Sequence, residues 1–149
     1  MIRVHSIVRT NQAESLMLRI TMPKHLGVHF SSASDNWRTP DETYKALHAE
    51  FDFNDDPCPI GGSGGLEREW GSRTFVNPPY SRIAEWVAYG YSQAYRGKIV
   101  VMLIPSRTDT SWWHSYVMKA KEIRFIKGRL KFSGHKNSAP FPSCVVVFR

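Results

Sequence analysis

The chain has 149 residues, of which 42% are apolar, with five Trp, six Tyr and eight Phe, and its formal net charge is +7 at pH 7. This size and composition fit one domain with a substantial core, and no segment reaches the roughly 18 consecutive apolar residues that span a membrane. The first eight residues also lack the charged head and long apolar stretch of a secretory signal. We therefore expect a cytoplasmic protein with no membrane partner.

The positive charge is unevenly distributed along the chain. The formal charge is +3 over residues 1–34, −5 over residues 35–95 and +9 over residues 96–149. A basic final third behind an acidic middle fits an enzyme that binds a polyanion and holds a small molecule in a separate pocket. Ordinary solvated lysines would also give a positive total.

The two cysteines lack the spacing of a zinc site, so we expect reduced thiols and no metal.

Clear sequence patterns for helices and strands begin at Trp37. We therefore divide the chain into a poorly defined N-terminal extension (1–36) and one domain (37–149). Residues 39–42 read Thr-Pro-Asp-Glu, which predicts a helix capping box with Thr39 as the N-cap. The helix that follows is expected to place four side chains on one face: Tyr44, Leu47, His48 and Phe51.

The next segment, residues 51–59, reads Phe-Asp-Phe-Asn-Asp-Asp-Pro-Cys-Pro and predicts a short strand that ends in carboxylates. A glycine-rich loop follows at residues 61–65. It lacks both the GxGxxG spacing and the lysine of a phosphate-binding loop. The loop is therefore either a different kind of ligand-binding loop or only a flexible connection.

The rest of the chain alternates strands and helices. Strands are predicted at residues 74–76, 98–104 (buried on both faces), 122–126, 130–132 and 143–148. Helices are predicted at residues 83–94, ended by Gly97, and around residues 113–120. This order predicts an α/β fold, a three-layer sandwich with a C-terminal β-hairpin formed by residues 122–126 and 130–132.

The most informative motif is Asn77-Pro78-Pro79-Tyr80, which ends the strand at residues 74–76. Asn77 offers a carbonyl acceptor, the two prolines fix the backbone and remove two competing donors, and Tyr80 offers a ring on which a base can stack. Such an elbow could hold both protons of an exocyclic amine on a planar ring. The alternative is an ordinary turn, since Asn-Pro often opens one.

Polar residues follow three of the predicted strands. They are Asp55 and Asp56 with Pro57, then the Asn77 elbow, then residues 106–109 with Arg107 and Asp109. Ligands bind outside the carboxyl ends of strands in open α/β sheets, so we expect these clusters to form one pocket. A salt bridge within the loop is the alternative role for Arg107 and Asp109.

Seven stretches together resemble one known family. They are residues 37–40, 53–59, 69–71, 75–81, 103–113, 128–132 and 140–148. In these stretches the chain resembles the bacteriophage-encoded DNA adenine methyltransferases, which transfer a methyl group from S-adenosylmethionine to the 6-amino nitrogen of adenine. The resemblance implies a compact Rossmann-like methyltransferase with a reduced number of strands. It also implies S-adenosylmethionine as cofactor, double-stranded DNA as partner and the cytoplasm of a host cell as location.

The resemblance also implies roles for matching residues. Asn77, Pro78, Pro79 and Tyr80 would grip the flipped base. Thr39 and Pro40 would lie beside the methionine part of the cofactor. Asp55 or Asp56, with Pro57, would supply the acidic group that binds the cofactor after the first strand.

Basic residues near the predicted hairpin, including Arg129 and Lys131, could contact phosphates. They could equally form a solvated edge that prevents aggregation. The alternatives to a DNA adenine methyltransferase are a methyltransferase for another planar amine (cytosine, RNA or a glutamine amide) and a degenerate nucleic-acid-binding domain without cofactor. The sequence carries no signal for a recognition sequence or an oligomeric state.

Overall fold

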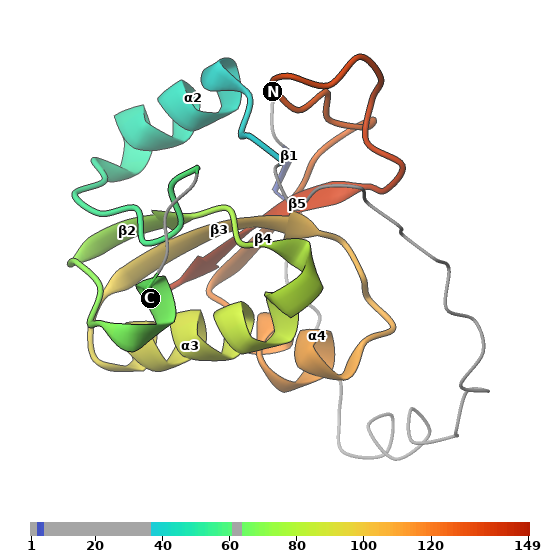
Figure 1. Cartoon of the computed structure of the whole chain (residues 1–149). Coiled ribbons are helices and arrows are strands. Elements are labelled where there is room, and N and C mark those ends of the chain that lie inside the picture. Colours follow the sequence, from blue (N-terminus) through green and yellow to red (C-terminus); the bar gives the residue numbers. More distant parts are fainter. Residues whose placement is uncertain (1–2, 5–36, 61–63) are drawn as a thin grey trace.

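The structure, a computed structural model, describes residues 3–4, 37–60 and 64–149 and contains a five-stranded mixed sheet (Figure 1). The strands are β1 (Arg3–Val4), β2 (Arg73–Val76), β3 (Ile99–Pro105), β4 (Glu122–Phe125) and β5 (Ser143–Phe148). The α-helices are α2 (Asp41–Phe51), α3 (Ile83–Tyr95) and α4 (Ser111–Ser115). Three single 3₁₀ turns cover Gly65–Glu67, Tyr80–Arg82 and Val117–Lys119. The boundary predicted at residue 37 stays a prediction, because residues 5–36 lie outside the described residues.

The strand order in the sheet is β1-β4-β5-β3-β2. Strands β2 and β3 are parallel, whereas β5 is antiparallel to both β3 and β4, and β1 is antiparallel to β4. An isolated parallel bridge between Asp55 and Thr74 places the segment after α2 beside β2. Three parallel segments therefore end at the same edge of the sheet.

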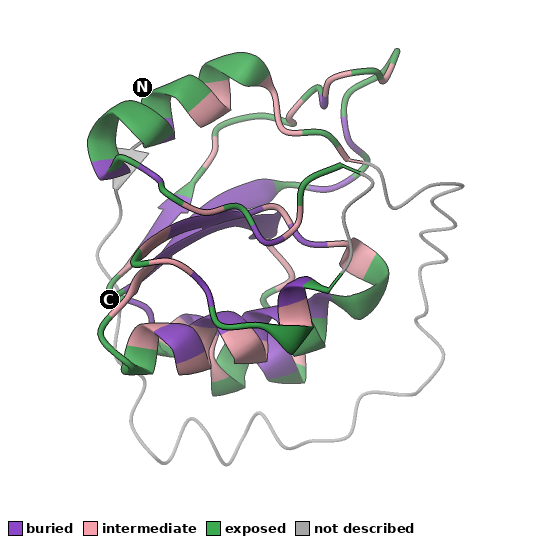
Figure 2. Ribbon diagram, turned by 60° about the vertical axis from the view of Figure 1, so that its left-hand side comes forward, coloured by how far each residue is buried: buried purple, intermediate pink, exposed green. Residues whose placement is uncertain are grey.

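Helices cover both faces of the sheet, with α2 on one side and α3 and α4 on the other (Figure 1). Alternation along β3 supplies both cores: Val101 and Leu103 pack with α2, and Val100, Met102 and Ile104 pack with α3. The sheet is buried, while the outward face of α2 is exposed (Figure 2). The predicted α/β class and the doubly buried strand at residues 98–104 are confirmed.

Helix α3 packs closely on β3 because Gly90 faces the sheet. A Cβ at this position would lie 2.9 Å from Met102 Sδ, so a larger residue would require the helix or the buried side chains beneath it to shift. The helix ends at Tyr95, and Gly97 follows with φ +90°. The predicted helix and its glycine stop are confirmed.

The predicted hairpin of residues 122–126 and 130–132 is wrong. Residues 130–132 form no strand, and β4 pairs with β5 instead. Phe132 is 1% exposed and packs with Phe141 in the core on the α2 side, and Ser133 forms a bridge to Arg38. Residues 126–142, here called the basic loop, thus use their apolar side chains as core anchors rather than as a strand face.

Two local predictions also need correction. Pro40, not Thr39, is the N-cap of α2, and it makes no side-chain cap hydrogen bond, so the predicted capping box is absent. The extended ψ of 135° at Pro40 delays the helix by one residue. The helix expected around residues 113–120 is divided into α4 and the 3₁₀ turn Val117–Lys119.

Candidate active site

The carboxyl ends of the three parallel segments bring the Asn77 elbow and Asp56 to one edge of the sheet. Asp55 pairs with Thr74 in β2, and Val76 at the end of β2 pairs with Met102 in β3. Asn77 therefore follows the middle segment of the three. Two of the three predicted clusters, Asp56 and the Asn77 elbow, line one cavity, whereas the third, residues 106–109, does not line it.

A cavity of about 790 Å³ opens beside Asn77. Its walls come from the segment before α2, from α2 itself, from residues 56–60 and 64–67, from the elbow and from the start of α3. The apolar part of the lining is formed mainly by Trp37, Tyr44, Pro59, Ile60, Leu66, Phe75, Pro79 and Trp86. This volume lies within the range of roughly 300–1,000 Å³ that is common for ligand pockets.

The carboxamide of Asn77 has a defined orientation. Its Nδ2 donates to the backbone carbonyl of Trp37 and, at 3.0 Å, to Thr39 Oγ1. A backbone carbonyl can only accept, so the end of the amide that faces Trp37 must be the NH2 group. Oδ1 is thereby left as the acceptor end of a side chain that lines the cavity.

Tyr80 supports this acceptor from the other side. Its hydroxyl donates to Asn77 Oδ1 at 3.3 Å, and its ring lies edge-on to Phe141 at 5.3 Å between centroids. Burial raises the pKa of the Tyr80 hydroxyl far above its ordinary value, so this group remains a neutral donor. Of the other elbow residues, Pro79 lines the cavity, whereas Tyr80, predicted to stack on a base, and the buried Pro78 are not among its lining residues.

The two adjacent aspartates have different environments. Asp55 makes a bidentate pair with Arg68, with both contacts at 2.8 Å, and accepts from the Gly71 backbone at 2.8 Å. These bonds, the Arg68 pair first, lower its pKa. Asp56 instead lines the cavity, where desolvation by the surrounding walls raises its pKa, although the residue as a whole is exposed to solvent. The Cys58 backbone donates to Asp56 Oδ1 at 3.1 Å.

A family model described as DNA N-6-adenine-methyltransferase (Dam) matches residues 29–145. The chain belongs to this family. Comparisons with curated proteins and with solved structures find no match. The Dam family match includes the Asn77 elbow, both aspartates, the cavity wall and the whole of the basic loop. Family membership indicates an enzyme that methylates adenine in DNA.

Of the remaining residues predicted for this Dam-family site, one lines the cavity and the others do not. Thr39 lines it, whereas Pro40 and Pro57 are not among its lining residues. Arg107 and Asp109 do not line it either: they belong to a turn after β3 in which Thr110 Oγ1 donates to the Arg107 carbonyl at 2.8 Å. Because β3 lies beyond β2, this turn lies on the side of Asn77 opposite to the Asp55 segment.

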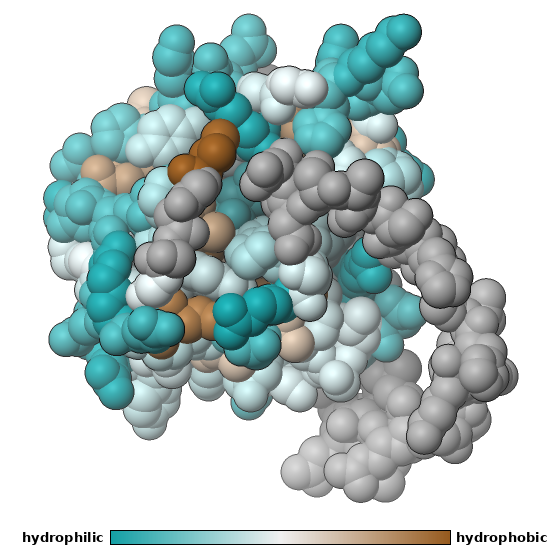
Figure 3. All heavy atoms as spheres, viewed as in Figure 1, coloured by the Kyte–Doolittle hydropathy of each residue, from teal (hydrophilic) through white to brown (hydrophobic). Residues whose placement is uncertain are grey.

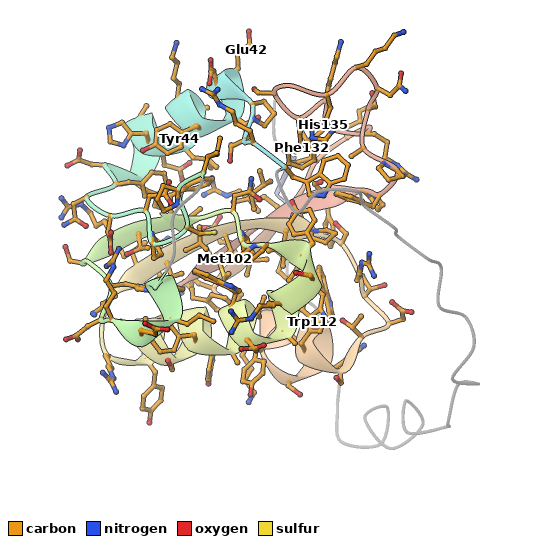
Figure 4. All side chains as sticks on the ribbon, viewed as in Figure 1. Glu42, Tyr44, Met102, Trp112, Phe132 and His135 are labelled. Carbon is orange, nitrogen blue, oxygen red and sulfur yellow. The ribbon has the colours of Figure 1, made fainter. Side chains whose placement is uncertain are left out.

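Arg129 and Lys131 are exposed on the basic loop and do not line the cavity. The loop contacts the cavity wall through Trp37, whose ring stacks on His135 at 4.3 Å with an interplanar angle of 16°. Phe132 and His135 lie on the same side of the sheet as Tyr44, opposite to Trp112 (Figure 4). A space-filling view shows hydrophilic residues gathered over this loop (Figure 3).

Sequence reasoning did not identify several residues that line the cavity, notably Trp37, Tyr44 and Trp86. The sequence predicts Tyr44 only as part of an apolar helix face, and Trp86 only as a residue within the helix at residues 83–94. Their helical spacing carries no signal for a cavity, because core residues have the same spacing. Trp37 had a usable signal, since it is the first residue of the stretch 37–40 that resembles the family.

The charges on the cavity wall are nearly balanced. They comprise four carboxylates and three cations: Asp41, Asp56, Glu67, Glu85, Arg38, Lys45 and Arg82. Arg82 and Glu85 pair with each other at 2.7 Å. Among the described residues, no cluster of three His, Cys, Asp or Glu could hold a metal ion. None of the helices described is long and apolar enough to cross a membrane.

Proposed function

We propose that this protein transfers a methyl group from S-adenosylmethionine to the 6-amino nitrogen of adenine in DNA, with the amine bound at Asn77. The single observation that carries this proposal is the orientation of the Asn77 amide, whose NH2 group faces the Trp37 carbonyl and Thr39 so that Oδ1 is the acceptor end beside a cavity. Family membership supports the same reaction. The helix-covered sheet supports a compact Rossmann-like methyltransferase fold.

The cavity residues fit S-adenosylmethionine. Aromatic and aliphatic walls suit an adenine ring, and Asp56 is the carboxylate that we assign to the polar groups of the cofactor. A lining with one more carboxylate than cations suits a sulfonium ion better than a phosphate. When bound, S-adenosylmethionine supplies the electrophilic methyl group. Asp55 has a different role, since it fixes Arg68 and the Gly71 backbone.

Asn77 and Pro78 activate the amine in this proposal. The lone pair of the adenine amine is delocalised into the ring, so the amine is a poor nucleophile. Acceptance of its two protons by Asn77 Oδ1 and the Pro78 carbonyl favours a pyramidal nitrogen, which restores the lone pair. Alignment of this nitrogen with the methyl group contributes several kcal/mol through proximity. Pro79 and Tyr80 hold the elbow rigid, and the surplus proton leaves to solvent after transfer.

DNA would bind over the basic loop. The target adenine must leave the duplex stack, which costs a few kcal/mol, and phosphate contacts offset that cost. Arg129 and Lys131 are exposed, and the loop joins the cavity wall at Trp37. Arg107 and Asp109, beside the elbow, are proposed to contact the DNA strand next to the flipped base.

The test is incubation of the purified protein with labelled S-adenosylmethionine and duplex DNA, followed by mass spectrometry of the nucleosides. We expect N6-methyladenine from the wild type. Asn77→Ala should lose at least about 100-fold in turnover, because the acceptor acts in the transition state, while cofactor affinity stays within about threefold. RNA, cytosine-only DNA and a glutamine peptide serve as competing substrates. Labelling of one of these in place of adenine would refute the proposed substrate.

A further inference from the structure

The orientation of the Asn77 amide depends on a second side chain. Trp37 and Thr39 accept the two Nδ2 hydrogens, and these acceptors lie about 40 residues before Asn77 in the sequence. The carbonyl of Trp37 is a backbone group that any residue would provide. Thr39 Oγ1, at 3.0 Å, is the only side-chain acceptor that the described residues offer to this NH2 group.

The segment that carries Thr39 is held in place independently of Asn77. Trp37 stacks on His135 and meets the edges of Phe132 and Phe141 at 5.3 and 5.4 Å. The backbone of Ser133 donates to the Arg38 carbonyl at 3.0 Å, which fixes the residue before Thr39. Thr39 therefore presents its hydroxyl from a rigid support, as an orienting group must.

Thr39 does not act as the helix N-cap that its sequence position predicts. Helix α2 has Pro40 as its N-cap and no side-chain cap hydrogen bond. The Thr39 hydroxyl is thus available to Asn77, and the loss of this hydroxyl would leave a donor in the cavity wall without its partner. Without the Thr39 hydroxyl, only the Trp37 carbonyl and the Tyr80 hydroxyl would hold the carboxamide, and a less restrained amide places Oδ1 less accurately against the substrate amine.

We propose that Thr39 is a positioning residue that fixes the Asn77 amide with Oδ1 toward the substrate amine. This inference rests on the proposed function. It assigns Thr39 to the catalytic step, whereas the family resemblance implies a contact with the cofactor. A positioning role affects kcat, whereas a contact with the cofactor affects the Kd for the cofactor.

The matched variants are Thr39→Val, which keeps the shape and removes the acceptor, and Thr39→Ser, which keeps the hydroxyl. Thr43→Val is the control, because Thr43 lies on α2 and does not line the cavity. For Thr39→Val we expect kcat to fall about tenfold or more, since a hydrogen bond in the active site is lost. Its cofactor Kd should stay within about twofold, and Thr39→Ser and Thr43→Val should stay near the wild type.

Equal kcat values for Thr39→Val and the wild type would overturn the inference. So would a loss of cofactor affinity that accounts for the whole decrease in kcat/KM. If Asn77→Ala is inactive while Thr39→Val is fully active, the proposed function survives and only the positioning role fails. An inactive wild type would instead refute the proposed function.

A second measurement does not depend on the folding of Thr39→Val. The side-chain NH2 resonances of Asn77 can be identified by their disappearance in Asn77→Ala. In the wild type and in Thr39→Ser, both protons should exchange with water at least about tenfold more slowly than those of the exposed Asn137. Exchange as fast as that of Asn137 would mean that the amide is not held, and would overturn the inference.

Discussion

The cavity and the basic loop lie next to each other but differ in charge and construction. The cavity wall mixes four carboxylates with three cations and includes the partly desolvated Asp56. The basic loop contains no acidic residue, and its cations are all exposed: Lys127, Arg129, Lys131 and Lys136. The loop is anchored by Phe132 and Phe141, which are buried in the core on the α2 side.

This difference separates recognition of a small cation from recognition of a polyanion. A phosphate would meet carboxylates in the cavity, whereas on the loop it would meet only positive charges and water. Substitutions in the cavity should therefore change cofactor affinity and turnover with little effect on DNA affinity. Substitutions on the loop should do the reverse.

The largest expected effect that tests this separation comes from Asp56. Asp56→Asn should weaken the affinity for S-adenosylmethionine by about 10- to 100-fold, because a charged hydrogen-bond acceptor contributes about 1.5–3 kcal/mol. Isothermal titration measures the change. DNA affinity, measured by fluorescence anisotropy, should stay near the wild-type value.

Asp55→Asn is the matched control for this prediction. Its partner Arg68 is 47% exposed, so the pair contributes about 1 kcal/mol or less to folding. We expect a small decrease in melting temperature and nearly unchanged cofactor affinity. If Asp55→Asn reduced the affinity more than Asp56→Asn, the assignment of the two residues would be reversed.

Much of the sheet and of its catalytic edge could be predicted from local sequence. Residues 99–104 form a continuous apolar run rich in β-branched residues, as in a strand buried on both faces, and Gly90 has the spacing of a close helix contact. The position of Asn77 at a strand end follows from the same pattern. Short-range periodicity was sufficient for these elements because the apolar pattern of each one lies within its own few residues.

The basic loop and Thr39 could not be predicted in the same way. Leu130 and Phe132 alternate as in a strand, but the backbone there pairs with Arg38, about 95 residues away. Thr39 has the local signature of an N-cap, yet its partner is Asn77. In both cases a long-range contact outweighs a local preference, and one sequence carries no record of such contacts.

A smaller effect is expected from the exposed cations of the basic loop. Arg129→Ala with Lys131→Ala should weaken DNA binding several-fold and reduce the slope of log K against log salt by about two, one for each lost phosphate contact. Cofactor affinity should not change. The control pair is Arg96→Ala with Lys121→Ala, which removes the same charge at the opposite edge of the sheet. Equal slopes for the two double variants would place the phosphate contacts elsewhere.

The smallest expected effect is a dependence of cofactor binding on pH that comes from Asp56. Because partial desolvation raises its pKa, Asp56 becomes protonated at a higher pH than an ordinary aspartate. Acidification from about pH 7.5 to about pH 5 should therefore weaken cofactor affinity in the wild type by up to a few-fold, and the affinity of Asp56→Asn should stay flat.

The effects of the two aspartates on stability have opposite signs. The raised pKa of Asp56 means that its contribution to folding is present below its unfolded pKa and is lost as the pH rises through the folded pKa. The lowered pKa of Asp55 gives a contribution present above its unfolded pKa and lost as the pH falls through the folded pKa. A bound cation would offset the cost of ionising Asp56. The rise in melting temperature that the cofactor produces should thus be larger at about pH 7.5 than at about pH 5, and the difference should vanish in Asp56→Asn but persist in Asp55→Asn.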